Sequence, residues 1–182
     1  KSSTAAATHA VAKAKYDATL ADTGCEKTAK AAYAKALDLD PSLAGSGNAG
    51  LLDQVTLIPA VRAELKWIET VHSTAYIRRF EEVCLSGNRT FDYPDNQMCV
   101  DTYETAFLAV GGVLDVARRI MEGELDNAFC AVRPPGHHAE RDLAMGFCLF
   151  NNAAIAARAL VSNGDVSRVL VVDWDVHHGN GT

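Results

Sequence analysis

The sequence predicts an α/β fold built on a parallel sheet, for three reasons. Two short apolar runs, residues 129–132 and 168–172, are typical of strands, the second of a strand buried on both faces. A helix-like stretch, residues 152–161, connects them. A strand, a helix and a strand in this order form parallel neighbours through a right-handed crossover. His and Asp residues follow both runs, at the strand ends where active sites of such sheets lie.

The amino-terminal part is expected to form a helical segment ahead of this sheet. Residues 5–20 are Ala-rich and helix-prone, and a capping box opens a second helix over residues 23–39. Residues 42–50 contain three glycines, which is typical of a flexible junction. We therefore expect residues 1–50 to be a helical hairpin with a Gly-rich linker, and residues 51–182 to be a separate domain.

Two helices are expected within that domain. The first begins near residues 101–104 and ends before Gly123, with apolar side chains at three- and four-residue spacing, namely Phe107, Val110, Leu114, Ala117 and Met121. The second is the connecting stretch, which Asn151 or Asn152 opens and which ends near residues 163–164. Both patterns predict helices packed on a common core.

Composition and charge limit the class of protein. Of the 182 residues, 48% are hydrophobic and 22% are charged, and no apolar run approaches the roughly 20 residues of a membrane span. Residues 51–182 carry 11 Lys and Arg against 18 Asp and Glu, which favours a basic tail or polyamine as ligand over direct nucleic-acid binding. Five Cys without C-x-x-C spacing predict a reducing compartment rather than a disulfide framework.

The second apolar run leads into potential metal ligands. If the extended conformation continues beyond it, alternation places Asp173, Asp175 and His177 on one face. Trp174 and Val176 then lie on the other face, where we expect Trp174 to be buried. Asp and His without Cys suit zinc, whose catalytic sites use three protein ligands, and one ligand could come from elsewhere.

The first apolar run leads into a potential base. Two prolines and a glycine, residues 134–136, predict a rigid, non-helical exit that presents His137 and His138 side by side. In a closed site, one of them could take a proton from an activated water. Two His pairs, each following an apolar run with Gly nearby, favour a functional site over surface histidines.

Three ordered motifs resemble those of the zinc-dependent histone deacetylases. They are R-P-P-G-H-H-A-E at residues 133–140, M-G-F-C-L-F-N-N at residues 145–152 and D-W-D-V-H-H-G-N-G-T at residues 173–182. The resemblance covers about residues 51–182 and is strongest to the class II branch and its bacterial relatives, which include acetylpolyamine amidohydrolases. It implies the three-layer fold of arginases and deacetylases, a parallel sheet between helical layers, of which this chain would hold a part.

Residue by residue, the resemblance implies a zinc site and a general base. Asp175 and His177 would be two of three zinc ligands. His138 would activate the water that attacks the acetyl-lysine carbonyl. His137 would be its electrostatic partner, and Asp173 would hold His137 in orientation.

Further residues would position the base and the substrate. Asn180 would be the neutral partner of His138, since class II members carry Asn at this position. Phe147, with Gly146 beside it, would form one wall of a narrow apolar channel for the lysine stem. Asp95 would be the rim carboxylate that grips the substrate backbone.

The resemblance also implies a third zinc ligand, an Asp, and a Tyr or His that polarises the substrate carbonyl, both from a later strand. Neither position is among the 182 residues, so we expect this chain alone to be inactive. A parallel sheet with an unpaired edge also predicts that further residues or a partner protein cover it.

Two functions stay open at this point. The first is a zinc-dependent deacetylase with a role in chromatin regulation, which hydrolyses acetyl-lysine peptides, acetylpolyamines or related acylated amines by metal-activated water. The second is a non-catalytic, truncated deacetylase-like module that serves as a structural or interaction subunit of a larger assembly. The resemblance suits the nucleus or the cytoplasm, and the sequence leaves an organelle open as well.

Overall fold

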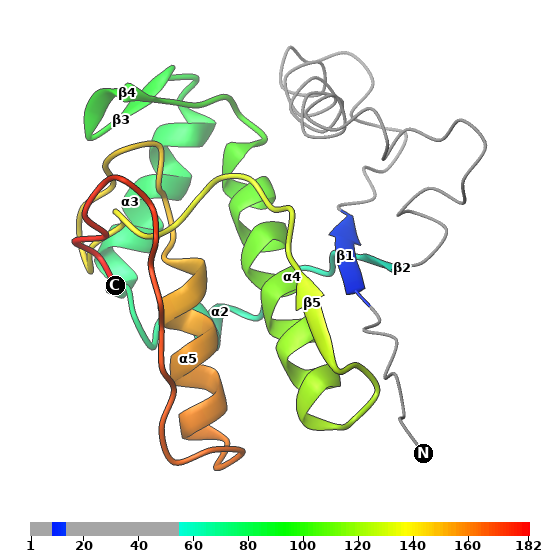
Figure 1. The fold of residues 1–182 in the computed structure, drawn as a ribbon. Coiled ribbons are helices and arrows are strands. Elements are labelled where there is room, and N and C mark those ends of the chain that lie inside the picture. Colours follow the sequence, from blue (N-terminus) through cyan, green and yellow to red (C-terminus); the bar gives the residue numbers. More distant parts are fainter. Residues whose placement is uncertain (1–8, 14–54) are drawn as a thin grey trace, which may run out of the picture.

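The computed structural model describes residues 9–13 and 55–182. Figure 1 shows the arrangement of the helices and strands. In chain order they are β1 (His9–Lys13), β2 (Val55–Pro59), α2 (Leu65–Ile68), α3 (Thr74–Leu85), β3 (Thr90–Phe91), β4 (Tyr93–Gln97), α4 (Thr102–Met121), β5 (Asn127–Phe129) and α5 (Asn152–Ser162).

A parallel sheet of three strands has the order β2-β1-β5. β1 is central, with His9 opposite both Val55 of β2 and Asn127 of β5. The helix expected over residues 5–20 is wrong for residues 9–13, which form a strand. Pairing with strands on both sides outweighs the helix propensity of this Ala-rich stretch, because tertiary context commonly overrides local propensity. The second helix and the Gly-rich linker expected within residues 1–50 lie outside the described residues.

Helices pack beside this sheet. α4 contacts β1 and β2, and it also contacts α3 and α5, so that it lies between the sheet and the other long helices (Figure 1). A short antiparallel hairpin, β3 and β4, lies near the amino-terminal end of α4. An α/β fold with a parallel sheet is therefore observed, while the full three-layer arrangement stays a prediction. No described helix is both long enough and apolar enough to span a membrane.

The two predicted helices are confirmed. α4 buries Phe107 and Val110 of its apolar stripe and packs Leu114 against the core, while Met121 at its end is exposed. α5 begins after Asn151, whose Oδ1 accepts a hydrogen bond from the backbone N–H of Ala154. This cap satisfies a donor that the first turn of a helix leaves unpaired.

The two strands predicted around α5 are only partly right. β5 ends at Phe129, so the first strand lies earlier than the predicted residues 129–132. Residues 168–172 form no strand, and the outer edge of β5 pairs with no described strand. The expected burial is wrong as well: Leu170 is 86% and Trp174 is 93% exposed.

An aromatic core lies under the loops that carry the sequence motifs. Phe80 of α3 and Phe107 of α4 meet the ring of Phe150 edge-on. The buried hydroxyl of Tyr76 donates to the carbonyl of Leu149 at 2.6 Å, and burial raises the pKa of this tyrosine. The core thereby fixes the backbone just before α5, which is where the motif residues converge.

Candidate active site

The loops 133–140 and 173–182 are joined by close backbone contacts. The N–H of Gly181 donates to the carbonyl of His137 at 2.8 Å. A Cβ atom on Gly181 would lie 2.2 Å from the carbonyl oxygen of Ala139, and one on Gly179 would lie 3.1 Å from Nδ1 of His137. Only glycine permits such approaches. These glycines therefore allow the two His-containing loops to lie against each other.

Asn151, the residue that caps α5, ties both loops to the core. Its Nδ2 donates to Oγ1 of Thr182 at 3.0 Å and to the carbonyl of Ala139 at 3.4 Å. Its backbone N–H donates to Nε2 of the buried His72 at 3.0 Å. Three segments that are distant in the sequence thus meet at one buried amide.

His137 and Asp173 form a hydrogen-bonded pair. Nδ1 of His137 lies 2.8 Å from Oδ2 of Asp173, and this contact is the main reason why the pKa of Asp173 is lowered. Asp173 therefore stays ionised and acts as the acceptor, so that Nδ1 of His137 carries the proton. The ring centroids of His137 and His138 are 4.1 Å apart, close enough for a charge on one to act on the other.

His138 is paired with a neutral side chain. Its Nδ1 lies 2.8 Å from Oδ1 of Asn180, and Nδ2 of Asn180 donates to Oε1 of Glu140 at 2.7 Å. A carboxylate can only accept hydrogen bonds, so Glu140 must face the NH2 group of the Asn180 amide. The amide oxygen of Asn180 is therefore directed toward His138. His138 therefore carries its proton on Nδ1 and has a free lone pair on Nε2.

Asp175 and His177 lie next to each other at the end of this network. Oδ1 of Asp175 accepts from the backbone N–H of His177 at 2.7 Å and lies 2.9 Å from its Nδ1. The backbone contact is the main cause of a lowered pKa of Asp175, which keeps it deprotonated, as metal ligation requires. The ring centroid of His177 lies 6.0 Å from that of His138.

The donor chemistry of this pair fits zinc, but it supplies only part of a site. An imidazole nitrogen and a carboxylate oxygen are both common zinc ligands, and a catalytic zinc takes three protein ligands. Within residues 9–13 and 55–182, no three or more His, Cys, Asp or Glu side chains are grouped so that they could hold a metal ion. The described residues therefore offer two ligands.

The predicted substrate residues lie on two neighbouring segments. Gly146 packs against the catalytic candidate His138, since a Cβ on Gly146 would lie 2.3 Å from Cδ2 of its ring. Phe147 follows in a turn with φ of 64° and is 60% exposed. Asp95 is exposed on β4, in the hairpin beside this turn.

Three residues of this arrangement were not assigned a role from the sequence. Glu140 belongs to the motif at residues 133–140. An acidic residue so close to two histidines was the sequence signal that could have identified it as part of the site. Asn151 was expected only to open a helix. Asn96, which binds the backbone of Phe147, had no signal beyond its position next to Asp95.

Comparison with known proteins agrees with this geometry. Residues 26–182 match the Histone deacetylase domain family, a match that begins within the segment 1–50 that was expected to be separate. The chain is 40% identical over 146 residues to histone deacetylase 5 of Arabidopsis thaliana. The aligned region covers 74% of this chain and 22% of that protein. The chain is 38% identical over 154 residues to histone deacetylase HDA1 of Saccharomyces cerevisiae, with 79% and 21% covered.

A solved structure is similar as well. The crystal structure of the HDA15 HD domain superposes with a TM-score of 0.74 at 30% identity and covers 97% of this chain and 49% of that chain. The chain thus spans about a fifth of these curated relatives and about half of this solved domain. Because the family match extends over most of its 182 residues, the chain belongs to the histone deacetylase family.

Proposed function

We propose that this chain supplies part of the catalytic domain of a zinc-dependent deacetylase that hydrolyses the amide of acetyl-lysine or of a similar acylated amine. The observation that carries the proposal is the pair of adjacent imidazoles with different partners, a carboxylate for His137 and an amide for His138. Because their partners differ, the two histidines can have different roles: His137 an electrostatic role and His138 the role of proton acceptor.

His138 is the proposed general base. Its Nε2 lone pair is free because Asn180 holds Nδ1–H, so it takes a proton from the attacking water and returns it to the leaving amine. Asn180 is neutral and therefore orients the ring without adding a charge. Asp173 holds the His137 ring in place beside His138, and His137 is the proposed electrostatic partner for the negative charge that develops on the substrate.

Asp175 and His177 are the proposed zinc ligands. When bound, zinc lowers the pKa of water and polarises a carbonyl. We propose that the third protein ligand comes from residues outside the described part, since the described residues offer two. We propose that a group which polarises the substrate carbonyl also comes from residues outside the described part. Such a hydrogen-bond donor contributes about 3 kcal/mol to the stabilisation of the oxyanion.

The substrate contacts follow from the segment beside His138. Phe147 is proposed to line the path of the lysine stem, and Gly146 leaves the room that His138 requires. Asp95 is proposed to bind the substrate backbone from the neighbouring hairpin. An acetylated lysine peptide or an acetylpolyamine meets these requirements, because each presents a flexible apolar stem that ends in an amide.

Acetate release by the complete natural polypeptide tests this proposal. The wild-type protein should release acetate from an acetyl-lysine peptide, and His138→Ala should reduce kcat by about 100-fold or more. Equilibrium zinc titration gives a second readout, in which Asp175→Ala and His177→Ala should weaken binding. Asp165→Ala, an exposed carboxylate in the turn after α5, is the control and should change neither quantity. A zinc-loaded protein without acetate release would contradict the proposal.

An alternative, non-catalytic role is favoured by a different observation. The side chains of Leu170, Val172 and Trp174 form an exposed apolar segment just before the metal-ligand candidates. Such a segment suits a module that docks into a larger protein assembly. Trp174→Ser should then abolish assembly, as sedimentation would report, whereas turnover by the 182-residue chain itself would rule this role out.

A further inference from the structure

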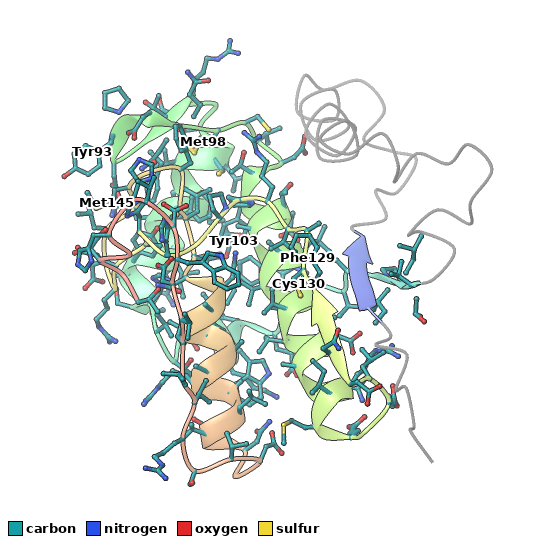
Figure 2. All side chains as sticks on the ribbon, in the orientation of Figure 1. Tyr93, Met98, Tyr103, Phe129, Cys130 and Met145 are labelled. Atoms are coloured by element: carbon teal, nitrogen blue, oxygen red, sulfur yellow. The ribbon has the colours of Figure 1, made fainter. Side chains whose placement is uncertain are left out.

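Two side chains of the β3–β4 hairpin hold the two ends of the turn 144–147. Oδ2 of Asp92, between the strands, accepts from the backbone N–H of Ala144 at 2.8 Å. Oδ1 of Asn96, in β4, accepts from the backbone N–H of Phe147, also at 2.8 Å. Figure 2 shows Met145 of this turn beside the hairpin segment that runs from Tyr93 to Met98. The hairpin is thus hydrogen-bonded to both ends of the turn.

Asn96 is fixed in the orientation that this contact needs. It is only 1% exposed, and its Nδ2 donates to the carbonyl of Phe91 at 3.0 Å. Because the amide nitrogen is used in this way, the oxygen is directed to the N–H of Phe147. Asp92 is held similarly by an ion pair with Arg79.

The turn has a backbone conformation that requires such support. Gly146 and Phe147 have φ values of 55° and 64°, and Asp92 in the hairpin has 61°. Residues other than glycine rarely adopt positive φ, and they persist there when neighbouring contacts hold them. On its other side the turn meets the ring of His138 at Gly146. The turn is therefore placed between the hairpin and the proposed base.

We propose that Asn96, together with Asp92, is a positioning residue for the substrate, since it sets Phe147 at a fixed place relative to His138. The inference rests on the proposed function. Asp95 precedes Asn96 and is exposed on the same strand, so one short hairpin presents the proposed rim carboxylate and holds the proposed channel wall. A change at Asn96 then alters substrate binding without touching the reacting groups.

Asn96→Ala in the complete polypeptide tests this inference, with Asn88→Ala as its control. Asn88 is exposed, and within the described part of the chain its amide donates to the nearby Ser86 hydroxyl. For Asn96→Ala we expect KM for an acetyl-lysine peptide to rise about tenfold while kcat stays within about threefold, the pattern of lost binding rather than lost chemistry. Hydrogen exchange of the Phe147 amide should also accelerate about tenfold or more, since its acceptor is gone. Asn88→Ala should change none of these quantities.

The outcomes separate this inference from the proposed function. A folded Asn96→Ala with unchanged KM and unchanged Phe147 exchange overturns the inference while the deacetylase proposal stands. If the wild-type protein releases no acetate, the proposed function fails, and Phe147 exchange alone decides whether Asn96 positions the turn.

A second pair of variants covers the case in which Asn96→Ala does not fold. Asp92→Asn and Asp92→Gly both tolerate positive φ, but only Asn keeps an acceptor for the N–H of Ala144. Both variants lose the ion pair with Arg79, but only the Gly variant also loses the acceptor for Ala144. Hydrogen exchange at Ala144 and KM should therefore rise more in the Gly variant than in the Asn variant. Equal behaviour of the two variants would overturn the inference.

Discussion

Asn180 accepts a hydrogen bond from Nδ1 of His138 at 2.8 Å and donates through Nδ2 to Glu140 at 2.7 Å. This chain of contacts fixes which nitrogen of His138 carries the proton. It also makes the partner of His138 neutral, whereas the adjacent His137 has the ionised Asp173. The two adjacent histidines therefore differ in the charge of their partners.

Asn180→Asp should shift the pH dependence of acetate release. A carboxylate beside Nδ1 stabilises the imidazolium form of His138, so the base is lost to protonation at a higher pH. The acidic limb of the kcat/KM profile should therefore move upward by about one pH unit or more. Asn180→Ala should instead lower kcat/KM by about 10- to 100-fold, because the ring loses its orientation. Identical profiles for wild type and Asn180→Asp would refute the assignment of His138 as base.

Gly146→Ala should impair catalysis more than it impairs folding. The new Cβ would lie 2.3 Å from the His138 ring and would displace it. Gly87→Ala is a matched control, because Gly87 also has positive φ, 78°, but a Cβ there would meet nothing within 4 Å. Both variants carry a similar backbone strain, and only Gly146→Ala must also displace the His138 ring. Gly146→Ala should therefore unfold at a somewhat lower temperature than Gly87→Ala, while acetate release falls only for Gly146→Ala. Equal activity of the two would argue against close contact between Gly146 and the base.

His72 should make stability depend on pH. It is fully buried, and burial lowers its pKa from the ordinary value of 6.5 to about 4. Above pH 6.5 the ring is neutral in both the folded and the unfolded chain, and its contribution is complete. Between pH 6.5 and pH 4 only the unfolded chain takes up the proton, so the free energy of unfolding falls as the pH falls.

The expected loss across this window is about 3 kcal/mol, from about 1.4 kcal/mol for each unit of pKa difference. Urea unfolding of wild type and His72→Gln at pH 7 and pH 4 measures this loss. The variant should show a flatter dependence, since glutamine does not titrate. The same slope in both proteins would show that His72 does not stay neutral in the fold.

Asn151→Ala should destabilise the fold and loosen both His-containing loops. Loss of the helix cap alone costs about 0.5 to 2 kcal/mol, and the contacts with Ala139 and Thr182 add to it. Asn163→Ala, at the exposed carboxyl end of α5, should stay within about 0.5 kcal/mol of wild type. Denaturant unfolding of the two variants provides the comparison. Similar values for both would mean that Asn151 does not join the loops to the core.

The sequence predicted those features that depend on local patterns. The apolar stripe of α4 and the capping Asn151 of α5 are local, and both helices form as expected. The motif residues came together for a similar reason, because glycines next to histidines permit the close approach of two loops. The partners of His137 and His138 were anticipated only through the family resemblance.

The features that depend on distant pairing were predicted less well. Residues 168–172 have the composition of a buried strand, but they pair with no described strand, and β5 stays at the edge of the sheet. Composition alone does not determine whether such a run pairs. Residues 9–13 have the composition of a helix, yet they pair with β2 and β5. The role of Asn96 was hidden for the same reason, since its partner Phe147 is 51 positions away in the sequence.

Acetate release from an acetyl-lysine peptide by the polypeptide isolated from its natural source, with and without removal of zinc, tests the central claim most directly. The proposed chemistry of His138, Asp175 and His177 predicts turnover that is lost on chelation and restored by zinc. A protein that binds zinc and acetylated peptide but releases no acetate would contradict it.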